Sequence, residues 1–255
     1  MTAIGLFAFV YAFKLVIGKQ EGFIVGGAVV HAIAKFPHVA FLALYKDSND
    51  EYMCGSSILN QWILITAAHC FDDIVKAHAS VGNVNRATGK LYRVESYRQH
   101  EKWDTVKVHY DIALCKLKKP IQFGHSVKRV LMVKRPPKAS VGDLAGWGAT
   151  EEKEYTESVQ LKHTRQKLWN HNQCKKVLSR VPRGTICGGE ARSRGNYASK
   201  GDSGSGLLVD NKIIIGLVSY KDPYVSRSLV IYTDVPYFYD WIQRTTRELE
   251  CSWGY

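Results

Sequence analysis

Residues 200–206 read Lys-Gly-Asp-Ser-Gly-Ser-Gly, so that Ser203 stands among glycines and directly follows Asp202. A serine on a tight glycine turn is surrounded by bare backbone N–H groups and leaves room for an approaching carbonyl group. Clusters of Gly, Ser and Asp are most often ordinary turns. The stretch therefore gains meaning only if a histidine, an aspartate and a suitable scaffold are found upstream.

Two candidate partners precede this stretch. His69 ends the segment Thr-Ala-Ala-His-Cys at 66–70, and Asp111 opens the apolar run Asp-Ile-Ala-Leu at 111–114. By itself His69 is most typical of a hydrogen-bonded core histidine. A metal ligand is the alternative, but no CxxC or HxxxH pattern accompanies it. By itself Asp111 is typical of a turn or a strand start.

The rest of the chain predicts an all-β protein. Short runs of β-branched and aromatic residues alternate with turn residues, which is typical of barrels or sandwiches. One helix is expected at the end, opened by Val235-Pro236 and apolar at every third or fourth position as far as Leu249. The expected strands are residues 38–45, 57–66, 90–95, 112–117, 130–133, 143–147, 158–168, 206–209, 213–220 and 229–233.

Composition narrows the functional classes. The 255 residues are 45% hydrophobic, which allows a sizeable core, and no linker or repeat divides the chain. The net charge of +12 is spread along the sequence without a basic stripe or a nucleic-acid motif. We therefore expect no nucleic-acid partner.

The first 17 residues are apolar apart from Thr2 and Lys14. They predict a signal peptide over residues 1–18 and a short propeptide over 19–23, with the mature domain at 24–255. A signal anchor is the alternative, although the run is short for a membrane span. Export would place the six cysteines in an oxidising compartment and leave no membrane segment after processing.

Six short motifs follow one another along the chain: IVGG at 24–27, CGSS at 54–57, TAAHC at 66–70, DIAL at 111–114, GWG at 146–148 and GDSG at 201–204. Together, and in this order, they resemble the chymotrypsin-type, or trypsin-like, serine peptidase family. The resemblance covers residues 24–245 and implies two six-stranded antiparallel β-barrels, a C-terminal helix and an active site in the cleft between the barrels.

The resemblance implies a catalytic role for each member of the three-residue set. Ser203 would be the nucleophile, His69 the base that accepts its proton, and Asp111 the carboxylate that orients His69. A serine hydroxyl needs such a base because it is a weak nucleophile on its own. The backbone N–H groups of Gly201 and Ser203 would form the oxyanion hole.

The resemblance also implies activation by cleavage. In the family, a cut before the residue at Ile24 frees an ammonium that pairs with the residue at Asp202. The residue before Ile24 is Phe23, so a trypsin-like activator is not expected to cut there. We expect either a chymotrypsin-like activating peptidase or an unusual activation route.

The resemblance pairs four of the six cysteines, Cys54 with Cys70 and Cys174 with Cys187. The family's bridge beside the specificity pocket is missing because Ser199 stands at its first position. Cys115 and Cys251 have no family partner. They are expected to be a buried thiol and an exposed one, with a bridge between them as the alternative.

The specificity pocket departs from the family pattern. Its base falls on Tyr197 rather than on the aspartate that selects Lys and Arg, and its walls fall on residues 219–221 and Val230. Trypsin-like specificity is therefore not expected. A narrowed, elastase- or chymotrypsin-like pocket is predicted, with acidic side chains as a second hypothesis because Lys200 and Lys221 flank the cleft. The wall residues are Ser219, Tyr220 and Lys221.

The sequence thus predicts a secreted, monomeric serine endopeptidase, a hydrolase acting on protein or peptide substrates and open to protein inhibitors. Its one-domain architecture favours an extracellular digestive member of the insect chymotrypsin-like type. No cofactor is expected, and no calcium site, because residues 74–94 lack carboxylates. A non-catalytic homologue used for binding is the main alternative, since Gly204-Ser205-Gly206 replaces the commoner Gly-Gly-Pro. A precursor left uncut before Ile24 is a third.

Overall fold

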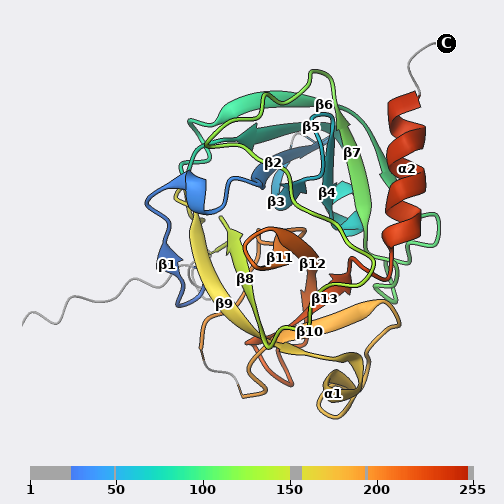
Figure 1. The fold of residues 1–255 in the computed structure, drawn as a ribbon. Coiled ribbons are helices and arrows are strands. Elements are labelled where there is room, and N and C mark those ends of the chain that lie inside the picture. Colours follow the sequence, from blue (N-terminus) through green and yellow to red (C-terminus); the bar gives the residue numbers. More distant parts are fainter. Residues whose placement is uncertain (1–23, 49, 150–156, 193–194, 252–255) are drawn as a thin grey trace, which may run out of the picture.

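The computed structural model describes residues 24–48, 50–149, 157–192 and 195–251. Two six-stranded antiparallel β-barrels lie side by side, and a helix at the end of the chain packs against the first barrel (Figure 1). The predicted fold class is confirmed. The predicted signal peptide and propeptide lie outside the described residues.

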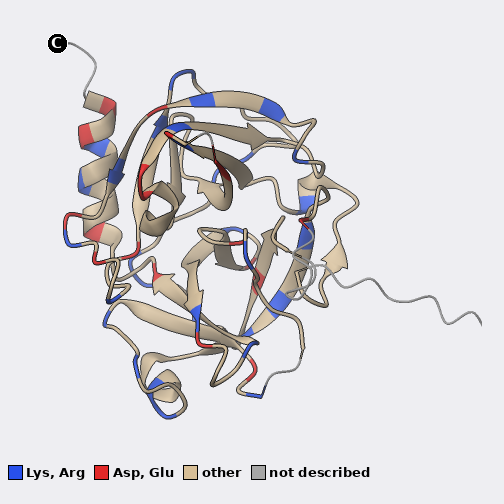
Figure 2. Cartoon of the chain, turned by 180° about the vertical axis from the view of Figure 1, so that it is seen from behind, with Lys and Arg blue, Asp and Glu red and all other residues tan. Residues whose placement is uncertain are grey.

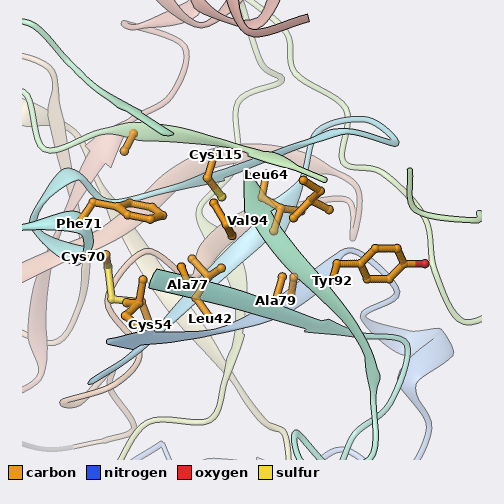
Figure 3. Close-up of a cluster of buried hydrophobic side chains, with 14 of the residues drawn as sticks. Leu42, Cys54, Leu64, Cys70, Phe71, Ala77, Ala79, Tyr92, Val94 and Cys115 are labelled. Carbon is orange, nitrogen blue, oxygen red and sulfur yellow. A yellow bond between two sulfur atoms is a disulfide. The ribbon is translucent and has the colours of Figure 1, made fainter. Parts of the chain in front are cut away.

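The N-terminal barrel closes in the strand order β2-β3-β4-β7-β6-β5. Its interior is filled by apolar side chains from every strand, among them Leu42, Leu64 and Val94, together with the thiol of Cys115 (Figure 3). The strands are β2 (Val39–Lys46), β3 (Glu51–Ile58), β4 (Ile63–Thr66), β5 (Ile74–Val81), β6 (Lys90–Gln99) and β7 (Ala113–Leu117).

The C-terminal barrel closes because β8 pairs with both β11 and β9. The short β1 (Ala28–Val29) adds to β9 from outside and brings the start of the described chain to this barrel. The strands are β8 (Val141–Gly146), β9 (Lys162–Trp169), β10 (Thr185–Gly189), β11 (Gly206–Val209), β12 (Ile213–Lys221) and β13 (Leu229–Asp234).

The predicted terminal helix is confirmed as α2 (Tyr239–Cys251). It buries Trp241, Ile242 and Leu249 in a core that also holds Ile63 and Leu114 of the N-terminal barrel. This apolar face ties the end of the chain back onto the first barrel. The other helical elements are η1 (Ile33–Lys35), η2 (Ala68–Phe71) and α1 (His171–Lys175).

Two strand predictions are wrong in detail. The run 57–66 is broken between β3 and β4, because the side-chain carbonyl of Asn60 accepts the N–H groups of Trp62 and Ile63 and holds a turn. Residues 130–133 form only an isolated bridge, from Leu131 to Ile213. Propensity favoured strands at both places, but the side-chain hydrogen bonds of Asn60 form a turn at the first, and pairing at the second is limited to one bridge.

Lysines and arginines are spread over both barrels (Figure 2). Of the helices in the described ranges, none is long and apolar enough to cross a membrane.

Candidate active site

His69 lies directly after a barrel strand. β4 ends at Thr66, and the chain then turns through η2, which carries His69 in its second position. The turn is braced twice: the Thr66 hydroxyl donates to the Gly55 carbonyl at 2.8 Å, and the predicted Cys54–Cys70 disulfide joins η2 to β3. The imidazole is thus held in place by rigid neighbours.

Asp111 is the buried partner of His69. One carboxylate oxygen accepts the His69 backbone N–H at 3.0 Å, and the other lies 2.8 Å from the ring Nδ1. The second oxygen also accepts a hydrogen bond from the hydroxyl of Ser219. With Nδ1–H donated to Asp111, the Nε2 atom of His69 is left as the acceptor.

The pair shifts both pKa values. Burial alone would raise the pKa of Asp111, but the charge of His69 and the hydrogen bonds from His69 and Ser219 outweigh it, so the pKa falls below its ordinary value. Burial alone would lower the pKa of His69, but the carboxylate of Asp111 outweighs it and the pKa rises. Together these shifts favour a charged carboxylate beside a basic imidazole.

Ser203 faces the same groove as His69. A groove of about 520 Å³ is lined by both residues and by Lys200, Gly201 and Met53. The backbone of Ser203 is tied to the other barrel, since its carbonyl accepts the N–H of Gly55 at 2.8 Å. Residues from both barrels therefore meet at this groove.

Gly201 occupies a position that favours glycine. Its φ is +93°, and a Cβ there would overlap the side chain of Met53. The preceding carbonyl, of Lys200, accepts the N–H of Ala149 at 2.7 Å. Because C=O and N–H point in opposite directions across a trans peptide, this bond turns the Gly201 N–H away from Ala149.

Asp202 is fully buried behind the serine. Its carboxylate oxygens accept the N–H groups of Gly148, at 2.8 Å, and Ser199, at 2.9 Å. Burial raises the pKa of Asp202 to about 6, since these neutral donors and the more distant Lys221 offset only part of the desolvation. Among the described residues no ion pair satisfies this carboxylate.

Ile24 lies in the interior of the same barrel. It is completely buried and packs in one cluster with Tyr197 and Tyr232. The hydroxyl of Tyr232 is buried without a hydrogen-bond partner in the described ranges, and burial together with the Asp202 carboxylate raises its pKa. The start of the predicted mature domain and Asp202 therefore border one buried cluster.

Comparison with known proteins decides the family. Residues 24–242, most of the chain, match the family model named Trypsin. The chain belongs to the trypsin family of serine peptidases. It is therefore a hydrolase of the serine endopeptidase class. Members of that family act on protein substrates and are bound by protein inhibitors.

Individual relatives agree with this assignment. Hypodermin-B from Hypoderma lineatum is 30% identical over 205 residues, which are 77% of this chain and 78% of the relative. Human cathepsin G is 28% identical and covers 94% of this chain and 93% of its own. A solved structure of HL collagenase has a TM-score of 0.75 at 22% identity, covers 87% of this chain and 98% of its own, and shows the shared fold.

Two of the residues predicted to form the specificity pocket, Tyr197 and Lys221, contact each other. Tyr197 is buried against Val230 and Ala198. The ammonium of Lys221 lies 4.5 Å from the centre of the Tyr197 ring and 3.4 Å from the Ala198 carbonyl. The Tyr197 ring and the Lys221 ammonium thus pack together.

The remaining predicted wall residues have other contacts. The Ser219 hydroxyl donates a hydrogen bond to Asp111. The Tyr220 hydroxyl is buried without a hydrogen-bond partner in the described parts of the chain. Lys200 is exposed at the groove on the other side of Gly201. Sequence reasoning assigned positions to these residues but missed the bond from Ser219 to Asp111.

Sequence reasoning also missed two supporting backbone groups. Gly148 and Ala149 hold Asp202 and the Lys200 carbonyl through their N–H groups. Gly148 ends the Gly-Trp-Gly motif, so the motif itself was the available signal. No sequence rule links a backbone donor to an acceptor more than fifty residues away.

Cys54, Cys70 and His69 place ligand-type atoms within 4.8 Å of one another. The two sulfurs are bonded to each other, so neither is a thiolate ligand, and Nδ1 of His69 is engaged by Asp111. This cluster braces the histidine turn and is not suited to a metal.

The second predicted disulfide, Cys174–Cys187, is present, and Cys115 and Cys251 are free thiols, one buried and one exposed. Burial raises the pKa of Cys115 to about 12, so this residue is an apolar part of the barrel core.

Proposed function

We propose that this chain is a secreted serine endopeptidase in which Ser203, His69 and Asp111 form the catalytic triad. The observation that carries the proposal is the 2.8 Å contact between Asp111 and Nδ1 of His69, in the groove that Ser203 also lines. That contact leaves Nε2 as the base that a serine hydroxyl needs.

The reaction follows from these positions. Nε2 of His69 accepts the Ser203 proton as the hydroxyl oxygen bonds to the substrate carbonyl carbon. The Gly201 and Ser203 N–H groups stabilise the negative oxygen that forms, a contribution of about 3 kcal/mol per donor. The imidazolium then gives its proton to the leaving amine, and water repeats the sequence to release the acid from Ser203.

Activation is proposed to depend on a cut between Phe23 and Ile24. The new ammonium would pair with Asp202, whose carboxylate is buried with neutral donors only in the described residues. A buried charge without a counter-charge is costly, so the cut would stabilise the loop that carries Gly201 and Ser203. The proposal assigns residues 1–18 to the signal peptide and 19–23 to the propeptide.

The specificity is proposed to be elastase- or chymotrypsin-like rather than trypsin-like. Tyr197 at the base has no negative charge for Lys or Arg, and Val230 and Lys221 reduce the space. A small or medium apolar side chain fits best. An acidic side chain is the second candidate, favoured by the ammonium of Lys221 above the Tyr197 ring.

The test is labelling by a fluorophosphonate after cleavage behind Phe23 by a chymotrypsin-like peptidase, with the new N-terminus at Ile24 confirmed by sequencing. We expect label on the cleaved protein, none on Ser203→Ala, and full label on the matched control Ser205→Ala. A cleaved, folded chain that stays unlabelled would instead support the non-catalytic binding protein.

Substrate profiling of the cleaved enzyme that accepts the label tests the side-chain preference of the pocket. Cleavage after small apolar residues supports the first specificity, and cleavage after Asp or Glu supports the second. Preferential cleavage after Lys or Arg contradicts both. Elution from a sizing column as a single chain would support the proposed monomer.

A further inference from the structure

A groove of about 560 Å³ lies on the outside of the N-terminal barrel, where β6 begins and the chain leaves β7. Its lining contains four cationic side chains and no carboxylate. The cations are Lys90, Arg93, Lys118 and Lys119, all of them exposed. The basic residues, although spread along the sequence, are therefore locally concentrated at this groove.

The backbone holds these cations close to one another. The Lys118 N–H donates to the Arg93 carbonyl at 2.9 Å, one step beyond the pairing of Leu117 with Val94. Lys90 is positioned by Gln122, whose side-chain oxygen lies 3.2 Å from the ammonium. Like charges on such a rigid frame repel one another and create a local positive potential.

No carboxylate in the described parts of the chain pairs with any of the four. Lys116, two residues before Lys118, offers a contrast because it is buried and lies 3.2 Å from Glu95. Among the described residues, the Glu95 carboxylate thus pairs with the buried Lys116 and not with a cation of the groove. An anion bound in the groove would meet uncompensated charge.

The groove also has an apolar part. Leu91 is 68% exposed between two of the cations, and Pro120 is exposed beside it. The ring of Tyr92 lies at the edge of the barrel core, and its hydroxyl is directed away from the buried apolar side chains (Figure 3). An exposed leucine next to fixed cations suits a partner that combines negative charge with an apolar side chain.

The partner would be held through side chains. β6 pairs with β5 on one side and with β7 on the other, so it has no open edge for an added strand. The groove is also separate from the catalytic cleft: Gln99, at the far end of β6, contacts the Ala68 carbonyl next to His69. At about 3.3 Å per residue, the groove begins about 20–30 Å away along that strand.

We infer that this groove binds an acidic polypeptide segment in which an apolar side chain stands between carboxylates. The cations pair with the carboxylates, and Leu91 packs against the apolar side chain. A sulfated glycan shares the charge but has no use for Leu91, and this difference separates the two partners by experiment. The inference goes beyond the proposed catalytic function and does not depend on it.

The test measures fluorescence anisotropy of a labelled peptide, Glu-Glu-Leu-Glu-Glu-Leu-Glu-Glu, with the full chain. Every protein carries Ser203→Ala, so the probe cannot be hydrolysed and catalysis plays no part in the readout. We expect saturable binding that weakens as sodium chloride rises. Binding should also fall at least tenfold in the double variant Arg93→Glu, Lys118→Glu.

The matched control is the double variant Arg135→Glu, Lys138→Glu, which changes the net charge equally in an exposed loop of the same protein. It should keep the affinity within about twofold. Leu91→Ser should weaken the peptide at least threefold and leave a heparin octasaccharide unaffected. Circular dichroism confirms that each variant is folded.

Three results would overturn the inference. Equal losses in the two double variants would mean that only net charge matters. An unchanged affinity in Leu91→Ser, with heparin displacing the peptide, would mean a glycan site. No saturable binding of the peptide at low salt would mean no site for it.

Discussion

Asp111, which contacts His69, and Asp202, which directly precedes Ser203, are both buried, yet their pKa values move in opposite directions. Asp111 faces an imidazole that can carry positive charge, and its pKa falls. Asp202 accepts only neutral N–H groups, and burial raises its pKa to about 6. Burial is common to both, so the presence of a cation in contact decides the direction.

The two carboxyls also affect stability with opposite pH dependence. The lowered pKa of Asp111 means that its contribution is present above its unfolded value and is lost as the pH falls. The raised pKa of Asp202 means that the uncut chain loses stability as the pH rises from 3.8 through about 6. Asp111 thus already has a partner that can carry positive charge, His69, whereas Asp202 accepts hydrogen bonds only from neutral N–H groups in the described residues.

Replacing Asp111 should have the largest effect. In the activated enzyme, Asp111→Asn should lower kcat by about 10⁴-fold, because an amide favours the wrong tautomer of His69. Steady-state kinetics on a peptide substrate measure this, with circular dichroism as the control for folding. A loss below tenfold would mean that Asp111 does not orient His69.

Replacing Asp202 should change stability in the uncut chain. Asp202→Asn removes a pKa shift from 3.8 to about 6, so the unfolding free energy of the variant relative to wild type should rise by up to about 3 kcal/mol between pH 4 and pH 7. The amide also places an NH₂ group against one of the two backbone donors, but that cost does not vary with pH.

Urea unfolding of both proteins across this pH range measures the difference. After cleavage before Ile24 the sign should reverse, since wild-type Asp202 then pairs with an ammonium. A difference that stays flat with pH in the uncut chain would contradict the buried, uncompensated charge.

Ser219→Ala should have an intermediate effect on kcat, through its hydrogen bond to Asp111. Removing one donor to the Asp111 carboxylate costs about 1.5 kcal/mol, which corresponds to about a tenfold loss in kcat. The pKa of Asp111 should rise, because a hydrogen bond that lowers it is gone. Unchanged kcat would show that Ser219 contributes only to packing.

Among these substitutions, Lys221→Met should have the smallest effect, and the effect is on the pH dependence of stability. Lys221 lowers the pKa of Asp202 and is the smallest of the causes that do so, so its removal should move the pH midpoint of the Asp202 contribution upward. The same variant should lose any preference for acidic substrates. A downward midpoint shift would contradict the assigned electrostatics.

Much of the fold could be predicted from the sequence. The family resemblance carried by six motifs implied both barrels and two disulfides, and the apolar periodicity after Val235-Pro236 predicted the terminal helix. The break at Asn60 and the isolated bridge at Leu131 were missed, since both depend on hydrogen bonds that propensity does not represent. The contact between Lys221 and Tyr197 was missed, although sequence reasoning assigned both residues to the pocket.

The sequence by itself determined which residues are available for chemistry: Ser203 among the glycines of 200–206, a histidine after one strand and an aspartate before another. Tertiary structure decided how each is used. Only the folded chain brings Ser219 to Asp111, Gly148 to Asp202 and an ammonium above Tyr197. The physical reason is that pKa and pocket shape depend on burial and on contacts between distant segments, and neither is encoded at a single position.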